Sequence, residues 1–203
     1  HYKINIMELL ELIINDEDES GVDYIALVDE PAIESHWMAF DKQKTLNLEF
    51  QIQDEEKRIV SGYFMIADLP IIRVNEKGEK FYVLFRKDTI NTIVNKFFKQ
   101  GYSNNINIMH NKNNEADGVY VIESLIIDSK RGSYAPSNFE KVPDGSWWGS
   151  MRIENDALWK MVQDGEFNGF SVEGIFKHKE KNKDYPESII TKIREVIKNY
   201  NKK

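Results

Sequence analysis

The stretch RIVSGYFMIADLPIIRVNEKGEKFYVLF, residues 58–85, decides the fold class because it carries the densest β pattern of the chain. Its runs RIVSGYFMIA and KFYVLF are rich in β-branched and aromatic residues, and the polar turn NEKGEK comes directly before the second run. The preceding run LNLEFQIQ, residues 46–53, has the same character. Strands that follow one another through short turns pair most economically as antiparallel neighbours. We therefore expect an antiparallel sheet at the centre of the fold.

A helix is predicted directly after this block, over residues 88–100. The sequence DTINTIVNKFFKQG places its apolar residues at helical spacing, which is typical of a helix with one buried face. Asp88 is a suitable N-cap, and Gly101 suits the position after the last turn.

A second helix is predicted over residues 155–165, in NDALWKMVQDG. Asn155 or Asp156 can cap its start, and Gly165 can end it. The chain then runs directly into GFSVEGIF, residues 169–176, which has the composition of a strand.

Three other segments complete the expected organisation. The runs NINIMH and GVYVIESLIID, joined by the polar loop NKNNEAD, predict a long hairpin over residues 105–128. The apolar residues of IMELLELII, residues 6–14, follow neither the 3.6-residue period of a helix nor the two-residue period of a strand cleanly, and we favour a strand over a helix. The acidic run DEDES after it lacks the glycine and the closing glutamate of an EF-hand loop, so a solvated turn is favoured over a cation site.

These elements predict one α+β domain over residues 1–178, followed by a separate tail over residues 179–203. The tail begins with the charged linker KEKNKD and continues as PESIITKIREVIKNY, whose apolar residues recur at helical spacing on a basic background. Such a helix can dock on the body of the protein or bind an acidic partner. We favour docking or a solvated face.

Composition excludes several classes of function. The 203 residues include no cysteine, which excludes disulfides, thiolate metal sites and cysteine nucleophiles and fits a reducing, intracellular setting. The four histidines show no paired metal-binding motif, so neither a metal nor a cofactor is expected. The net charge of −7 disfavours nonspecific nucleic-acid binding, and no apolar run approaches the roughly 20 residues that cross a bilayer. A homo-oligomeric state is left open.

Three residues could carry chemistry if the predicted strands are regular. Ser171 lies between Phe170 and Val172, so it points away from the face that those two residues bury. His110 shares its parity with the isoleucines of NINIMH, and Glu123 shares its parity with the valines and leucine of VYVIESL, so both polar groups fall on apolar faces. A buried imidazole and a buried carboxylate each need a partner. A serine, a histidine and a carboxylate are the parts of a nucleophilic triad, although each residue taken alone more often has a structural role.

Longer stretches carry a resemblance to a known family. VDYIALVDEPAIESHWMAF, the block SGYFMIADLPIIRVNEKGEKFYVLF, INIMHN with VIES downstream, and GSWWGSMRIENDALWKMVQDGEFNGFSVEGIF together resemble the XkdF-type serine proteases of tailed bacteriophages. The resemblance spans most of residues 20–176. Its most specific features are a histidine that closes a strand after a helix, and a helix that ends shortly before GFSxEG.

The resemblance implies a function and a fold. The family is grouped with prohead maturation proteases, whose fold is similar to that of the herpesvirus assemblin protease, a mostly antiparallel β-barrel with surrounding helices. Its members are implied to work in the host cytoplasm, inside the assembling procapsid, where they cleave scaffold and major capsid proteins and finally themselves. The family's serine falls on Ser171 and its histidine on His110.

The third member of the triad is less directly implied. Assemblins use a second histidine after the serine, but His178 lies at an odd offset from Ser171 and Asp128 has the wrong parity. Glu173 shares the face of Ser171 and is interpreted as a residue of the cleft. We therefore favour Glu123. The sequence does not assign the backbone amides of the oxyanion hole; the loop SKRGSYAPS, residues 129–137, is only a guess, based on the backbone freedom of Gly132. Trp147 and Trp148 are expected to line a groove or to belong to the core.

Two functions from different classes remain. The first is a prohead serine endopeptidase with Ser171, His110 and Glu123 as its triad. The alternative is a noncatalytic assembly protein of the same fold that binds scaffold or capsid through its lysine-rich tail. A hydrolase based on two carboxylates has little support, because the acidic residues are spread without a distinctive pair.

Overall fold

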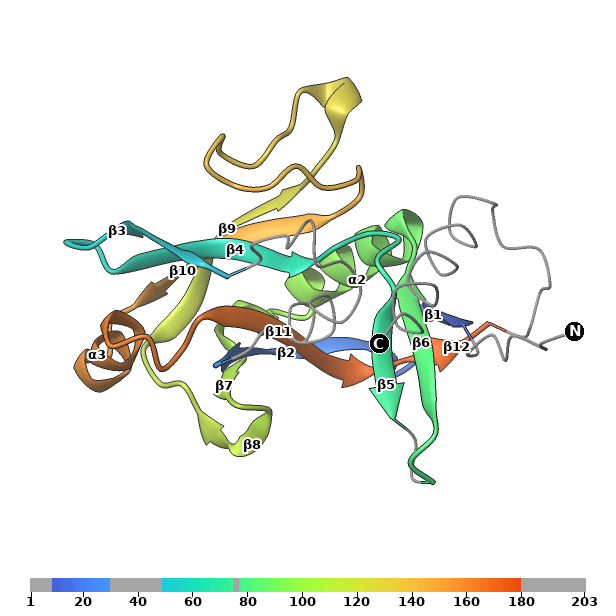
Figure 1. Ribbon diagram of the computed structural model, residues 1–203, viewed down its shortest axis with the longest axis horizontal. Coiled ribbons are helices and arrows are strands. Elements are labelled where there is room, and N and C mark those ends of the chain that lie inside the picture. Colours follow the sequence, from blue (N-terminus) through green and yellow to red (C-terminus); the bar gives the residue numbers. More distant parts are fainter. Residues whose placement is uncertain (1–8, 30–48, 75–76, 180–203) are drawn as a thin grey trace, which may run out of the picture.

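The computed structural model describes residues 9–29, 49–74 and 77–179. Within these ranges the chain forms three open four-stranded sheets and two α-helices (Figure 1). The predicted β-rich character is confirmed. The tail helix expected after residue 185 lies outside the described residues, so the boundary at residue 178 stays a prediction.

The three sheets are named by their content. The serine sheet consists, in spatial order, of β11 (Gly169–Ile175), β2 (Gly21–Val28), β7 (Ile106–Ile108) and β8 (Asn111–Glu115). The tryptophan sheet consists of β3 (Gln51–Asp54), β4 (Ile59–Met65), β10 (Trp147–Ile153) and β9 (Val119–Ile126). The end sheet consists of β12 (Lys177–His178), β1 (Leu9–Ile13), β6 (Lys80–Phe85) and β5 (Ile71–Val74). Neighbouring strands are antiparallel except in the pairs β1–β6 and β2–β7.

The expectation of a barrel is wrong for the described residues. Their strands form separate sheets with open margins, and no ladder of hydrogen bonds joins one sheet to the next. The physical reason is that alternating apolar residues specify which face of a strand is buried, whereas closure of a barrel depends on which strands meet at the two margins. The pairing of strands at the margins cannot be predicted from the sequence of any single strand.

The main core lies between the serine sheet and the tryptophan sheet. Phe170 of β11 meets Phe64 of β4 at a ring-centroid distance of 4.9 Å, and Phe64 meets Trp147 of β10 at 4.8 Å. All three rings are buried. Trp148 packs on the opposite face of the tryptophan sheet against Phe139, so both tryptophans belong to apolar clusters. The packing of Phe170 fixes which face of β11 points inward.

Both predicted helices are confirmed. Helix α2 (Lys87–Lys99) buries the apolar face read from the sequence and is followed by Gly101 in the left-handed region, with φ 77°. Its N-cap position is Arg86, so the predicted cap at Asp88 is wrong; Asp88 is the second residue of the helix, within the first turn. Helix α3 (Asp156–Gln163) is capped by the Asn155 side chain, which accepts hydrogen bonds from two backbone amides.

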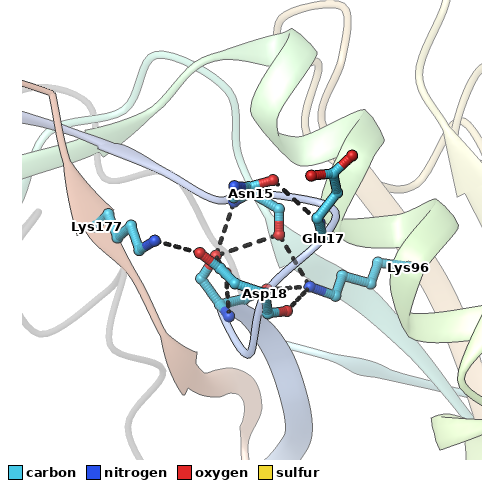
Figure 2. A network of polar contacts seen from close by, with 6 residues as sticks. Asn15, Glu17, Asp18, Lys96 and Lys177 are labelled. Carbon is cyan, nitrogen blue, oxygen red and sulfur yellow. Dashed lines mark hydrogen bonds and ion pairs between the residues drawn. The ribbon is translucent and has the colours of Figure 1, made fainter.

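Helix α2 is tied to the loop between β1 and β2 by a buried lysine. Figure 2 shows the Lys96 side chain reaching from the helix to this loop. Its ammonium group donates to the backbone carbonyls of Asn15 at 3.0 Å and Ser20 at 2.7 Å, and also to that of Asp18. The acidic loop is therefore held by a lysine of the protein itself, which agrees with its interpretation as a turn.

Replacing Lys96 by methionine is expected to lower the free energy of unfolding by about 2–4 kcal/mol, because three loop carbonyls lose their charged donor while the stem is replaced by a similar apolar chain. Chemical denaturation measures the loss. Lys99→Met, on the exposed side of the same helix, is the control and should change stability little. Equal effects of the two variants would show that the loop does not depend on Lys96.

The carboxylate of Asp18 is held in the same network. Lys177 donates to it from β12 (Figure 2). Ser20 donates its hydroxyl and its backbone amide to the same carboxylate. The hydrogen bond from Lys177, followed by those from Ser20, holds the pKa of Asp18 well below its usual value of 3.8.

A lowered carboxylate pKa stabilises the fold above the unfolded pKa, and this contribution is lost as the pH falls toward the folded pKa. Asp18→Asn is therefore expected to lower the melting temperature by a few degrees at pH 7, with a difference from wild type that narrows below about pH 4. Thermal unfolding between pH 3 and pH 8 tests this. The exposed Asp16→Asn in the same loop is the control. A difference that widened in acid would contradict the assignment.

Within the described ranges, no helix has the length and the apolar character needed to cross a membrane.

Candidate active site

Ser171 lies on the outer face of the serine sheet. Its neighbours Phe170 and Val172 pack into the main core, so alternation along β11 turns Ser171 and Glu173 to the other side. Ser171 pairs with Ala26 of β2 and is only 6% exposed. Its side-chain hydroxyl has no hydrogen-bond partner in the part of the chain that the structure describes. The face predicted for this serine agrees with the structure.

His110 lies in a tight turn and not at the end of a regular strand. Ile108 of β7 pairs with Asn111 of β8, so Met109 and His110 form a two-residue hairpin loop. Both have positive φ, 54° and 59°. This backbone shape is the one that Asn-Gly sequences favour, and it is strained for methionine and histidine. Strain of this kind is often found at functional sites.

The predicted long hairpin is thus wrong. The polar run NKNNE forms β8, which pairs with β7 in the serine sheet, whereas the VIES run belongs to β9 in the tryptophan sheet. The parity argument for His110 fails for the same reason, because the turn breaks the alternation after Ile108.

The acid beside His110 is Glu173. Its Oε2 lies 3.5 Å from the Nδ1 atom of His110 and accepts a hydrogen bond of 3.0 Å from the Nδ2 atom of Asn107. The His110 side chain is 42% exposed and that of Glu173 is 21% exposed. Because Nδ1 faces the carboxylate, Nε2 is the ring nitrogen that can interact with another group, such as a hydroxyl.

The strand register places the serine beside this pair. Ser171 of β11 and Asn107 of β7 both pair with Ala26 of the intervening β2, so the three residues form one row across the sheet. Neighbouring strands lie about 4.8 Å apart, and only the methyl group of Ala26 stands between the two polar side chains. Glu173 is two residues along β11 on the same face. The outer face of the serine sheet therefore gathers a serine, a histidine, a glutamate and an asparagine.

Glu123 is placed elsewhere. It is exposed on β9 of the tryptophan sheet, where its Oε2 accepts a hydrogen bond from the hydroxyl of Ser150. Ser150 in turn contacts the hydroxyl of Ser61 at 2.7 Å. The predicted hydrogen bond between His110 and Glu123 is not formed among the described residues, because β9 pairs with β10 instead of with β7. Glu173 was interpreted from the sequence as a residue of the cleft, but not as the partner of His110.

Asp128 and His178 lie outside this cluster as well. Asp128 caps a single 3₁₀ turn by accepting from the amides of Lys130 and Arg131. His178 is exposed in β12 of the end sheet, opposite Leu12. Both side chains therefore belong to surroundings other than those of Ser171 and His110.

The loop proposed for the oxyanion hole covers the tryptophan sheet, on its outer face (Figure 1). A cavity of about 550 Å³ lies beneath it, lined by Tyr63, Tyr134 and Phe139 among others. Burial, with a contribution from Glu140, raises the pKa of Tyr63 to about 12, and its hydroxyl donates to the Glu140 carbonyl at 2.5 Å. The loop therefore lies over a different sheet from Ser171, and the oxyanion hole stays unassigned.

The described ranges contain no group of three or more histidine and carboxylate side chains that could hold a metal ion. The polar cluster around Ser171 has the composition of a site for nucleophilic acyl transfer, in which a hydroxyl, an imidazole and a carboxylate act together.

Comparison with protein families agrees with this composition. The model of a family described as "Putative phage serine protease XkdF" matches residues 47–180. The chain belongs to this family. The resemblance read from the sequence is confirmed, and the match includes His110, Glu173 and Ser171. No curated protein and no solved structure matches the chain. The expected likeness to the assemblin fold therefore stays a prediction for this family member.

Proposed function

We propose that the chain is a serine endopeptidase in which Ser171 is the nucleophile, His110 the general base and Glu173 the carboxylate that orients the histidine. The observation that carries the proposal is the approach of Glu173 Oε2 to Nδ1 of His110 on the face that also presents Ser171. Family membership supports the reaction class at the level of a phage serine protease.

The proposed reaction follows the chemistry of acyl transfer. The Ser171 Oγ attacks the carbonyl carbon of the scissile peptide bond while its proton passes to Nε2 of His110. The imidazolium that forms is stabilised by the Glu173 carboxylate at Nδ1. His110 then gives the proton to the leaving amine, and the acyl group stays on Ser171. A water molecule, deprotonated by the same nitrogen, releases the acyl group and restores the serine.

The geometry supports a site that tightens when substrate binds. His110 is the most exposed member of the cluster and sits on a hairpin turn, whereas Ser171 is nearly covered on a strand. Catalytic hydrogen bonds are often long before substrate binds. In the proposed mechanism the imidazole moves toward Ser171 as the peptide is bound, and the 3.5 Å contact with Glu173 shortens with it.

The proposed substrates are the scaffold and major capsid proteins of the phage, cleaved within the procapsid, with cleavage of the protease itself as a final step. This part of the proposal rests on the resemblance to prohead maturation proteases. The competing function is a noncatalytic assembly protein. The low exposure of Ser171 and the absence of a hydrogen bond from its hydroxyl within the described residues favour this second function.

One experiment separates the two functions. The purified chain is incubated with a fluorophosphonate, which reacts only with activated serines, and in parallel with its cognate scaffold and capsid proteins. Mass spectrometry should find the phosphonate on the peptide that contains Ser171 and should find discrete fragments of the protein substrates. Binding of scaffold or capsid with neither labelling nor cleavage would support the assembly protein and reject the protease.

A further inference from the structure

Asn107 is a buried amide in a strand that otherwise buries isoleucine. It lies between Ile106 and Ile108 in β7, and its exposed fraction is 0%. Because Ile106 and Ile108 contribute to the main core, Asn107 points to the outer face, toward the row of Ser171. Burial of an amide is unfavourable unless hydrogen bonds replace those it made with water. The position therefore calls for a specific partner.

That partner is Glu173. The Nδ2 atom of Asn107 donates to Oε2 of Glu173 at 3.0 Å, and this is the oxygen that lies 3.5 Å from Nδ1 of His110. The Oδ1 atom of Asn107 is buried and has no partner in the part of the chain that the structure describes. The hydrogen bonding of this side chain within the described residues is thus directed to a single carboxylate oxygen.

A neutral donor is well suited to this task. A glutamate side chain has three rotatable bonds, and fixing its carboxylate requires a donor whose own position is rigid. Asn107 is held by the backbone pairing of β7 with β2 and by complete burial. An amide also fixes the carboxylate without neutralising it, whereas an arginine or lysine would compete with the imidazolium for its charge.

We infer that Asn107 is a positioning residue, which holds the carboxylate of Glu173 against His110 and so sets the orientation of the imidazole. The inference rests on the proposed function. Its distinctive consequence is that Asn107 acts only through Glu173. Removal of Asn107 should therefore slow the chemical step when Glu173 is present and have no further effect when the carboxylate is absent.

The test is a double-mutant cycle of Asn107→Ala and Glu173→Ala in the full chain. The readouts are kcat and KM on a peptide that the wild type cleaves, and the rate at which fluorophosphonate labels Ser171. Asn107→Ala is expected to lower kcat and the labelling rate by about 10–100-fold, with KM changed less than about threefold. In the Glu173→Ala background the same substitution should change each rate by less than about twofold.

Two further variants keep the test decisive. Asn107→Leu keeps the approximate size of the side chain but has no donor for the Glu173 carboxylate, so it should lose as much activity as Asn107→Ala. Asn105→Ala is the matched control, because Asn105 donates its amide to the backbone carbonyl of Asp23 and not to the cluster, and its kcat should stay near that of the wild type. Thermal unfolding of every variant identifies any that fail to fold, and Asn107→Leu replaces Asn107→Ala if the alanine leaves a destabilising cavity.

The outcomes distinguish the inference from the proposed function. Equal losses from Asn107→Ala with and without the Glu173 carboxylate would show a general structural role and overturn the inference, while the protease would stand. Wild-type activity in Asn107→Leu would overturn it as well. A wild-type chain that neither reacts at Ser171 nor cleaves any substrate would reject the proposed function, and the inference with it.

Discussion

Ser171→Ala is expected to lower the rate of peptide cleavage by about 10⁴-fold or more, because no other group in the proposed mechanism can form the acyl intermediate. The fold should be unaffected. The Ser171 hydroxyl has no hydrogen-bond partner among the described residues, so its loss should change the free energy of unfolding by about 0.5 kcal/mol or less. Mass spectrometry of substrate fragments measures the first effect, and chemical denaturation measures the second.

Ser150→Ala provides the matched control for this prediction. Ser150 is also buried in a strand, and its hydroxyl donates to Glu123 and contacts Ser61. Its loss should therefore destabilise the protein by about 1 kcal/mol while cleavage continues. Persisting cleavage by Ser171→Ala, in a preparation free of other proteases, would remove Ser171 as the nucleophile. A large loss of stability in Ser171→Ala would instead favour a structural role for this serine.

The orientation of Ser171 could be predicted because it depends on local alternation alone. Phe170 and Val172 are apolar and their neighbours Ser171 and Glu173 are polar, so any regular strand must bury the first pair and turn the second pair outward. The helices were predictable for a similar reason, since the apolar spacing of α2 and the Asn155 cap of α3 are both contained within a few residues.

The partner of His110 could not be predicted in this way, because it depends on which strands pair. The run NKNNE has no apolar alternation, and it reads as a loop although it pairs with β7 as β8. Met109 and His110 adopt positive φ without the asparagine or glycine that normally signals such a turn. Once this turn is missed, β9 becomes the apparent partner of β7, and Glu123 takes the place that Glu173 occupies.

A detectable signal for Glu173 was nevertheless present. Ser171 and Glu173 share a face by the same alternation that orients the serine. The distance of about 6.6 Å between their Cα atoms, which argued against direct contact with each other, leaves room for an imidazole from another strand. An acid two residues after a serine, on the same outward face, is too far away to contact the serine. It can still be the third member of a triad, because an imidazole fits between the two side chains.

The two glutamates give the sharpest test of this correction. Glu173→Gln is expected to lower kcat by about 10²–10⁴-fold, since the amide keeps the shape of the carboxylate but cannot balance the charge of the imidazolium. KM should change much less, because the loss falls on the transition state. Glu123→Gln should leave kcat within about twofold of wild type, because its side chain is exposed on the tryptophan sheet and glutamine can still accept the hydrogen bond from Ser150.

The opposite result would restore the assignment made from the sequence. If Glu123→Gln lost turnover and Glu173→Gln did not, the approach of Glu173 to His110 would be incidental, and β9 would have to reach the histidine in the working enzyme. Steady-state kinetics on one peptide substrate decide between the two, with melting temperatures to confirm that both variants are folded. Because each substitution changes only one carboxylate to an amide, a difference between them reports on position and not on the kind of change. The contact at Nδ1 of His110 predicts that Glu173 is the residue whose charge the reaction needs.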